Sequence, residues 1–473
     1  ADTDFRNLML GQRPPKKDPS VKLRHAYNSN YDQVILKAMQ ATDYFLLVGP
    51  PGTGKTSMAL QYLVREYQDR DILLMAYTNR AVDEICGMLE RSGFDYLRIG
   101  KPFSCDRRYT AHLLGNAVSE GGNLREIRQK VEGVHIVVGT TTSLQSSASI
   151  FQMKHFCCAI IDEASQILEP SLIGLLARVP KFILIGDYKQ LPAVVQQPEA
   201  LTAIGSRELR EAGFADCRES LFQRLIRLEA HAGRTDFTAV LNRQGRMHEA
   251  IVDFANRMFY TTEHLQCVPL QHQVESRIYP DGCAAWTDTP VGEFIASRRY
   301  VFIPSRFCID PEQSDKVNAD EARITADVVM AVRHTYAQLF DPDTTVGVIV
   351  PYRNQISMVR RLLEQTGDPL LSRISIDTVE RYQGSQRDVI VYSFTIQHRY
   401  QLDFLTSNNF LEDGREIDRK LNVALTRARR QMIVVGNEAI LNYNPIFRGL
   451  IGYIKQRKGY FERQERGETP SFN

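Results

Sequence analysis

The sequence lacks the long hydrophobic run that a membrane-spanning helix requires. No apolar stretch among its 473 residues approaches the roughly 20 residues needed to cross a bilayer. The first residues are polar and charged, unlike a secretory signal peptide. We therefore expect no membrane partner and an intracellular location, cytoplasmic or in the nucleoid for a bacterial source and nuclear for a eukaryotic one.

Cysteine pairs with the spacing of metal ligands are also missing. The eight cysteines form no C-x-x-C pair, which gives little support to zinc or iron–sulfur binding. Cys157 and Cys158 precede an apolar segment, so we expect buried thiols and a reducing compartment.

The chain has no marked excess of one charge. Its 58 basic residues face 56 acidic residues, for a net charge of +2. A nucleic-acid site would therefore be a local channel and not a uniformly basic face.

Strand and helix patterns alternate from about residue 33. Continuous apolar strands between helical patterns indicate parallel sheets covered on both faces. The predicted strands are Phe45–Val48, Ile72–Ala76, His135–Val138, Ala159–Ile161 and Phe182–Ile185, then Val346–Val350, Ser375–Thr378, Val389–Phe394 and Met432–Val435.

Composition changes along the chain predict two domains. The predicted parts are a lead-in over 1–26, a first domain over 27–227 with an insertion at about 100–133, a joint over 228–235, a second domain over 236–460 and a charged tail over 461–473. The polar lead-in and the first residue, which is not Met, predict additional domains upstream in a longer parent chain.

The segment Gly49–Ser57 fits the pattern G-x-x-x-x-G-K-[ST] directly after an apolar strand. The backbone N–H groups of such a loop wrap phosphates, helped by the positive end of the following helix. Lys55 would reach the β- and γ-phosphates, and the Thr56 hydroxyl would hold Mg²⁺. We predict a nucleoside triphosphate site made by Gly49, Pro50, Gly52, Thr53, Gly54, Lys55, Thr56 and Ser57.

Polar residues follow two later strands of the first domain. Asp162 would hold the hydration shell of the metal, and Glu163 would orient and deprotonate water. An acidic pair alone could be a solvated loop, but the phosphate loop makes that interpretation improbable. Gln190 could sense the γ-phosphate, although by spacing alone a simple turn over Gly186–Pro192 is the better interpretation.

The second half of the chain contributes arginines. Arg246 lies in Gln244–His248 and Arg427 in Leu421–Arg430. A guanidinium from another domain can stabilise charge on a transferring phosphoryl group, which would make hydrolysis depend on domain closure. Without context, a basic helix face is the better interpretation of Arg427–Arg430.

Taken together, these segments resemble the superfamily 1B helicases, in the family's order over residues 27 to 437. The branch with the nonsense-mediated-decay RNA helicases and the flap-processing DNA nuclease–helicases is the most similar. The further segments that carry the resemblance are Asn30–Gln33, Tyr77–Asp83, Val138–Thr142, Val346–Gln355 and Asp377–Gly384. Arg381-Tyr382-Gln383-Gly384 and Ala76-Tyr77-Thr78 favour the DNA enzymes over the RNA enzymes.

The resemblance implies an α/β fold of two tandem RecA-like P-loop domains, with parallel sheets and helices on both faces. It implies ATP and Mg²⁺ in the cleft between them, with Gln33, Gly384 and Gln386 also near the nucleotide. The implied catalytic residues are Lys55, Asp162, Glu163, Gln190, Arg246 and Arg427. The implied contacts to single-stranded DNA are Thr78, Asn79, Thr140, Thr141, Tyr352, Arg353 and Thr378. The implied activity is ATP-dependent 5′→3′ movement on that strand.

Two residues depart from the family pattern. Gly245 stands where a tyrosine usually stacks on the base, and Gln386 where an acidic residue often lies near the ribose. Both leave the base and sugar selectivity open. The alternatives are an RNA helicase or ribonucleoprotein remodeller, and a non-unwinding ATPase clamp module of a larger nuclease. A metabolic kinase is a weaker alternative because it has no use for the second domain's motifs.

Overall fold

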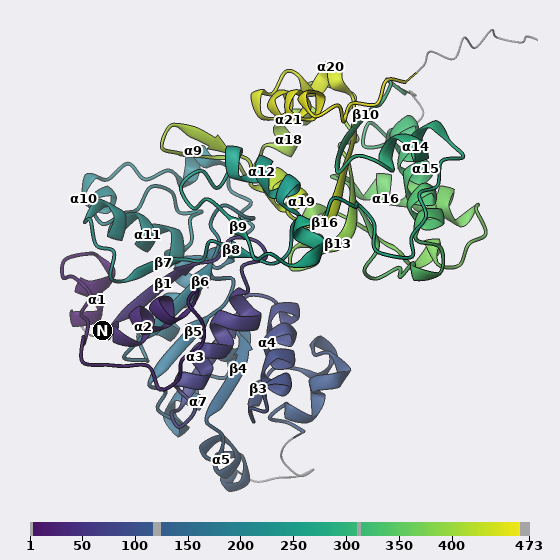
Figure 1. The fold of residues 1–473 in the computed structure, drawn as a ribbon. Coiled ribbons are helices and arrows are strands. Elements are labelled where there is room, and N and C mark those ends of the chain that lie inside the picture. The colour runs from purple at the N-terminus through teal and green to yellow at the C-terminus, as the bar shows by residue number, and fades with distance from the viewer. Residues whose placement is uncertain (1–2, 117–123, 310–313, 464–473) are drawn as a thin grey trace, which may run out of the picture. The chain divides into compact units, whose positions relative to one another are not determined.

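The structure is a computed structural model that describes residues 3–116, 124–309 and 314–463. It divides into two compact units, Ala1–Arg243 and Gln244–Asn473. Each unit is built around its own parallel sheet (Figure 1). The predicted tail beyond residue 463, and residues 117–123 of the predicted insertion, lie outside the described residues.

The first unit contains a seven-stranded parallel sheet in the order β3-β4-β2-β5-β6-β1-β7. Its strands are β1 Tyr44–Val48, β2 Ile72–Ala76, β3 Leu97–Ile99, β4 Ile136–Thr140, β5 Cys158–Ile161, β6 Phe182–Gly186 and β7 Thr238–Val240. All residues of β1 to β6 are buried, which is why these strands are largely apolar without alternation, apart from the buried Arg98 in β3.

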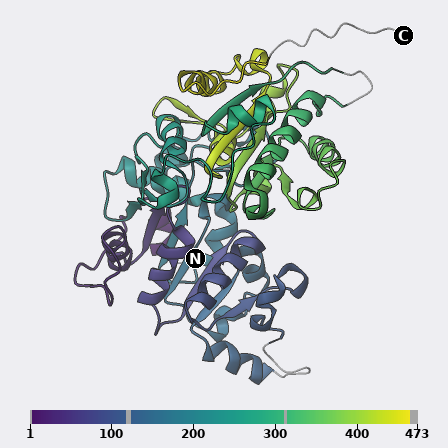
Figure 2. The ribbon, with the colours of Figure 1, turned by 45° about the vertical axis from the view of Figure 1, so that its right-hand side comes forward.

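Helices cover both faces of this sheet, as the two views of Figures 1 and 2 show. They are α1 Thr3–Met9, α2 Asp32–Gln40, α3 Gln61–Glu66, α4 Asn79–Arg91, α5 Leu124–Gly133, α6 Thr141–Ser146, α7 Ile150–Met153, α8 Glu169–Leu176, α9 Glu199–Thr202, α10 Arg207–Glu211 and α11 Leu221–His231. The helix α4 buries Val82, Ile85, Cys86 and Leu89, whose spacing of three to four residues forms one apolar face.

The boundary between the units differs from the predicted joint. Residues 221–231 form helix α11, and β7 adds to the first sheet by pairing Leu46 with Thr238 and Val48 with Val240. The units divide after Arg243. The strands β7 and β3 were both missed: β7 is short and partly exposed, and β3 is short and contains Arg98, so both lack the continuous apolar run from which the other five strands were predicted.

The second unit contains a five-stranded parallel sheet in the order β10-β16-β13-β11-β12. Its strands are β10 Tyr300–Pro304, β11 Val346–Ile349, β12 Ser375–Asp377, β13 Arg387–Ser393 and β16 Ala428–Gly436. The short pairs are β8 Arg243–Gln244 with β9 Gln266–Cys267, and β14 Phe410–Glu412 with β15 Arg415–Ile417. The strand β10 was absent from the predicted set.

The helices of the second unit surround this sheet. They are α12 Glu249–Met258, α13 Gln271–Val274, α14 Pro290–Ile295, α15 Ala319–Tyr336, α16 Arg353–Glu364, α17 Val379–Tyr382, α18 Gln401–Leu405, α19 Arg419–Leu425, α20 Glu438–Leu441 and α21 Pro445–Gln456. The long helix α15 packs across β11, β13 and β16. Two tandem parallel α/β units confirm the predicted RecA-like fold class.

Within the described ranges, no helix combines the length and apolar character that crossing a membrane demands.

Helix α11 is fixed to the first unit by a buried ion pair. The Arg224 guanidinium donates two hydrogen bonds to Glu169, at 2.7 and 2.6 Å, and two more to the carbonyls of Met9 and Ala212 at 2.8 and 3.0 Å. The Arg224 side chain is almost fully buried.

We expect Arg224→Met to lower the free energy of unfolding of the first unit by about 3–5 kcal/mol, because Glu169 would keep a buried charge without its partner. The matched control is Arg207→Met, which removes the exposed pair between Arg207 and Glu211. Urea unfolding of both variants measures the difference. Equal, small losses in the two variants would contradict a structural role for the buried pair.

Candidate nucleotide and nucleic-acid sites

The predicted phosphate loop forms a closed turn after β1. The Gly49 N–H donates to the Gly186 carbonyl at 2.9 Å, and the Thr53 hydroxyl donates to the Pro50 carbonyl at 2.8 Å. Gly52 and Gly54 have φ angles of 76° and 75°. Glycine adopts such angles without the steric cost that other residues bear, so the loop depends on both.

Lys55 begins the helical segment that follows the loop. This segment, Lys55–Leu60, is a π-helical turn that continues into α3. The Lys55 ammonium donates to the Gly49 carbonyl at 2.5 Å. A Cβ atom at Gly49 would lie 2.2 Å from Lys55 Cγ, so the side chain can fold over the loop only where residue 49 is glycine.

Tyr31 anchors the loop, and the sequence patterns gave it no role. Its buried hydroxyl donates to the Thr53 carbonyl at 2.8 Å. Its ring meets Tyr62 edge-on, and Tyr62 also stacks on Tyr27 with ring centroids 4.3 Å apart. Gln33 lies two residues beyond Tyr31 and is exposed on α2. The start of α2 is therefore tied to the phosphate loop.

The two predicted metal ligands are in contact. The Thr56 hydroxyl donates to the Asp162 carboxylate, which lies at the end of β5. Burial, with a further contribution from the neighbouring Glu163, raises the pKa of Asp162 to about 6. A hydroxyl, one carboxylate, water and phosphate oxygens suit Mg²⁺, which rarely has an all-protein cage. The described residues contain no cluster of three or more His, Cys, Asp or Glu that could hold a metal ion.

Glu163, the predicted base, has an unusual backbone conformation. Its φ is 52°, a left-handed value that is uncommon outside glycine. Its N–H donates to Asp162 at 2.9 Å, and its carboxylate accepts a hydrogen bond from Gln166 at 3.2 Å. The strained turn therefore presents two neighbouring carboxylates with separate partners.

The predicted phosphate sensor, Gln190, is buried. Its amide donates to Asp187 at 2.7 Å, and Asp187 also accepts the Lys189 N–H at 3.1 Å. Since β6 pairs with β1 from Phe182 to Gly186, this turn begins beside the start of the phosphate loop.

The residues of the first unit that are predicted to contact DNA come just after two neighbouring β-strands. Ala76 pairs with Thr140 across β2 and β4. Thr78 caps α4 by accepting the Ala81 N–H at 3.1 Å, and Thr140 caps α6 by accepting the Ser143 N–H at 3.0 Å.

Only part of this predicted set is accessible. Thr78 and Asn79 are exposed, whereas Thr140 and Thr141 are 6% and 2% exposed. The buried threonines cap and pack a helix terminus, and their predicted DNA contact requires a local opening.

Three segments of the second unit that are predicted to lie near the nucleotide contact one another. Arg246 donates to the Gln386 side chain at 2.9 Å and to the Thr426 carbonyl at 3.2 Å. Arg427 donates to the carbonyls of Ser385 and Val423 at 3.3 and 3.1 Å. Arg427 is buried, so its predicted contact with a phosphate requires that it leave these carbonyls. Gly384 precedes Ser385 with a left-handed φ of 83°.

Gly245 is not required by the backbone. Its φ lies outside the left-handed region, and an added Cβ would meet only Leu270 at 3.5 Å, an ordinary contact. The backbone and the Cβ position of residue 245 would therefore accept a side chain.

The residues of the second unit that are predicted to contact DNA also come just after adjacent β-strands. Ile349 of β11 pairs with Asp377 of β12, and Tyr352 and Thr378 come just after them. Arg353 is exposed and Thr378 is partly exposed, whereas Tyr352 is buried.

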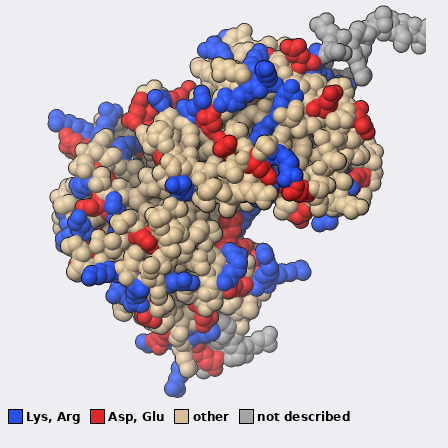
Figure 3. Space-filling view, in the orientation of Figure 1, with Lys and Arg blue, Asp and Glu red and all other residues tan. Residues whose placement is uncertain are grey.

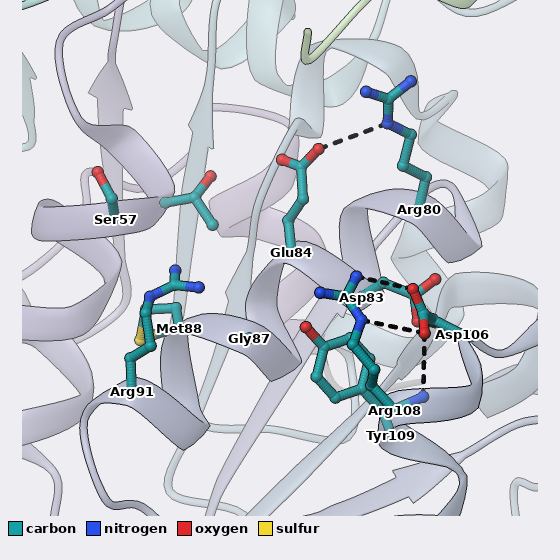
Figure 4. A pocket seen from close by; sticks show the side chains of 11 residues that line it. Ser57, Arg80, Asp83, Glu84, Gly87, Met88, Arg91, Asp106, Arg108 and Tyr109 are labelled. Atoms are coloured by element: carbon teal, nitrogen blue, oxygen red, sulfur yellow. Dashed lines mark hydrogen bonds and ion pairs between the residues drawn. The ribbon is translucent and has the colours of Figure 1, made fainter. Parts of the chain in front are cut away.

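A cavity of about 470 Å³ opens beside Thr56 and Ser57 (Figure 4). Its walls are α4 and the predicted insertion, with Arg80 paired to Glu84 at 3.6 Å and Arg108 to Asp106 at 2.8 Å. Basic and acidic side chains are intermixed over the face shown in Figure 3. This agrees with the expectation that a nucleic-acid site would be a local channel and not a uniformly basic face.

The loop, the contact between Thr56 and Asp162, and the two parallel sheets define a P-loop nucleotide-binding protein with two RecA-like units. Two family models, both described as AAA domains, match the chain, one over residues 217–439 and the other over 26–125 and 114–198.

Curated relatives are similar over nearly the whole chain. The DNA replication ATP-dependent helicase/nuclease JHS1 of Arabidopsis thaliana is 29% identical over 96% of this chain and 32% of its own length. The DNA replication ATP-dependent helicase/nuclease DNA2 of Homo sapiens is 27% identical over 93% of this chain and 40% of its own length. The chain thus spans well under half of these relatives.

Among solved structures, the arterivirus nonstructural protein 10 helicase in complex with DNA is 15% identical, with a TM-score of 0.41 over 88% of this chain and 63% of its own. The family models and the curated relatives support the predicted resemblance to the superfamily 1B helicases, and they show that the chain is related to the DNA replication helicase/nucleases.

Glu321 joins strand ends in the second unit. This fully buried residue of α15 accepts hydrogen bonds from Ser305 at 3.1 Å, Ser393 at 2.6 Å and the Thr395 N–H at 2.7 Å. Burial raises the pKa of Glu321 to about 7.

We expect Glu321 to make the second unit less stable as the pH rises from about 4.5 to 7. Because its folded pKa is above its ordinary value of 4.5, the folded state binds more protons in this window, and the loss approaches roughly 3 kcal/mol above it. Glu321→Gln carries no charge at either pH. The melting temperature of the variant minus that of the wild type should therefore be larger at pH 8 than at pH 5. The control is Glu364→Gln, an exposed site on α16. A pH-independent difference for Glu321→Gln would refute this assignment.

Proposed function

We propose that the chain is the motor of an ATP-dependent DNA helicase or translocase that moves 5′→3′ on single-stranded DNA. The observation that carries the proposal is the direct contact of Thr56 with Asp162, which assembles the two metal ligands at the mouth of the phosphate loop. The relatives named as DNA helicase/nucleases support DNA as the substrate.

The first unit would bind and activate the nucleotide. Backbone N–H groups of Gly52–Thr56 would hold the phosphates, and the Lys55 ammonium would move from the Gly49 carbonyl to the β- and γ-phosphates. Mg²⁺ held by Thr56 and Asp162 would neutralise charge on the phosphates. Glu163 would accept the proton of the attacking water, with Gln166 fixing its carboxylate.

The second unit would complete hydrolysis and make it depend on domain closure. Arg246 and Arg427 would exchange their present partners for phosphate oxygens, which stabilises charge that develops on the transferring phosphoryl group. Thr78 and Asn79 in the first unit and Arg353 and Thr378 in the second would hold the DNA backbone in turn. Alternating grip during the ATP cycle would produce movement.

The proposal is tested by ATP turnover with and without oligo-dT, and by displacement of a strand from duplexes with a 5′ or a 3′ tail. We expect oligo-dT to stimulate turnover and only the 5′-tailed duplex to be unwound. Lys55→Ala should reduce kcat by at least roughly 100-fold because it removes a preorganised charge from the phosphates. Lys16→Ala, at an exposed lysine of the lead-in, should match the wild type.

Each alternative function has its own outcome. Stimulation by oligo-dT without displacement would identify a non-unwinding clamp of a larger nuclease. Stronger competition by oligo-U than by oligo-dT would identify an RNA helicase. No stimulation by either strand would reject both the proposal and these alternatives. The free cysteines of the described residues fit the proposed intracellular location, which for a eukaryotic source would be the nucleus.

The space at Gly245 predicts a gain of nucleotide affinity. Gly245→Tyr should fold normally and bind ATP several-fold more tightly, because a ring at this position can stack on the base. Calorimetric titration with ATP measures the change, with Gly245→Leu as a variant that adds bulk without a ring. Equal affinities in the tyrosine and leucine variants would show that the base does not lie at this position.

A further inference from the structure

A groove of about 400 Å³ lies at the carboxyl-end edge of the second unit's sheet. The segment after β11, the segment after β13 and the residues just before α15 form its walls. The residues that matter here are Lys316, Tyr352, Arg353, Tyr400, Gln401 and Phe404. Only Tyr352 and Arg353 of these six belong to a motif recognised in the sequence, so the two aromatic residues Tyr400 and Phe404 had no predicted role.

The groove exposes aromatic rings to solvent. Tyr400 is 60% exposed and Phe404 is 44% exposed. Phe404 stacks on Tyr352 with ring centroids 5.1 Å apart, and Tyr400 stacks on His398 at 5.4 Å. The rings are therefore supported by packing on neighbouring rings while part of each remains open to a partner.

Buried polar contacts hold the segment that carries these rings. The Gln401 side chain accepts the N–H groups of Gln397 and His398 at 2.8 and 2.9 Å, and donates to the Asp315 carbonyl at 2.8 Å. Lys420 donates to the Phe404 carbonyl at 2.8 Å, and its ammonium lies 4.1 Å from the centroid of the Phe404 ring. A groove fixed in this way loses little conformational entropy when it binds a ligand.

The charges around the groove favour an anionic chain. Lys316 and Arg353 are exposed within its lining, and Arg399 is exposed on an adjoining hollow. The acidic residues are Asp403, in that hollow, and Asp315, which accepts the Tyr400 hydroxyl. Aromatic faces beside cations are the combination by which proteins hold single-stranded nucleic acid, because every base can stack and every phosphate is anionic.

We propose that Tyr400 and Phe404 form a base-stacking platform for single-stranded DNA, with Lys316 and Arg353 on the adjacent phosphates. This inference rests on the proposed function and deepens it. Thr378 and Arg353 would hold only the DNA backbone, whereas the platform would contact bases without reading their sequence.

The test compares Tyr400→Leu, which keeps an apolar side chain but removes the ring, with Tyr400→Phe, which keeps the ring but removes the hydroxyl. Fluorescence anisotropy measures binding to oligo-dT and to an abasic oligonucleotide of equal length. We expect Tyr400→Leu to weaken oligo-dT binding roughly tenfold while leaving abasic binding nearly unchanged. Tyr400→Phe should bind both strands like the wild type, and Phe404→Leu should repeat the selective loss.

The matched control is Leu339→Ala. Leu339 is 52% exposed and precedes β11 at the opposite edge of the sheet, so this variant should behave as the wild type. Melting temperatures of all variants should stay within a few degrees of the wild type, since both ring sites are exposed.

Several outcomes would overturn the platform. Unchanged oligo-dT binding in both leucine variants would reject the platform and leave the proposed function intact. Equal losses for oligo-dT and the abasic strand would show contact with the backbone alone. A loss in Tyr400→Phe as large as in Tyr400→Leu would assign the effect to the hydroxyl bond with Asp315. A wild-type protein that binds neither strand would reject the proposed function itself.

Discussion

Parallel strand pairing is the constraint on which both candidate sites depend. Because β5, β6 and β1 are neighbours and point the same way, the loops that follow them emerge at one edge of the first sheet. That alignment brings Thr56, which is 106 residues from Asp162 in sequence, to the carboxylate it contacts. In the second sheet the same alignment brings the segments that follow β11 and β12, which carry Tyr352 and Thr378, to one edge.

The two units stabilise their sites by opposite electrostatic means. The first unit buries an acid, Asp162, whose charge is unfavourable until a cation shares it. The second unit holds Arg246 and Arg427 through hydrogen bonds to backbone carbonyls and to the Gln386 side chain.

Much of the fold could be predicted from sequence because its strands are buried on both faces and are therefore continuously apolar. The phosphate loop and the contact partners Thr56 and Asp162 could be predicted because backbone geometry demands glycine and the chemistry demands a hydroxyl and a carboxylate. The half-exposed β7 gave no such signal. The anchoring role of Tyr31, the burial of Thr140 and Arg427, and the exposure of Tyr400 arise from tertiary packing, which leaves no periodic pattern in the chain.

The hydrogen bonds of Arg246 and Arg427 link the same two segments of the second unit. Arg246 holds Gln386 and the carbonyl of Thr426, the residue before Arg427, while Arg427 holds the carbonyl of Ser385, the residue before Gln386. Each guanidinium thus restrains the segment on which the other depends. Displacing either side chain would therefore remove a contact that helps to hold the segment carrying the other arginine.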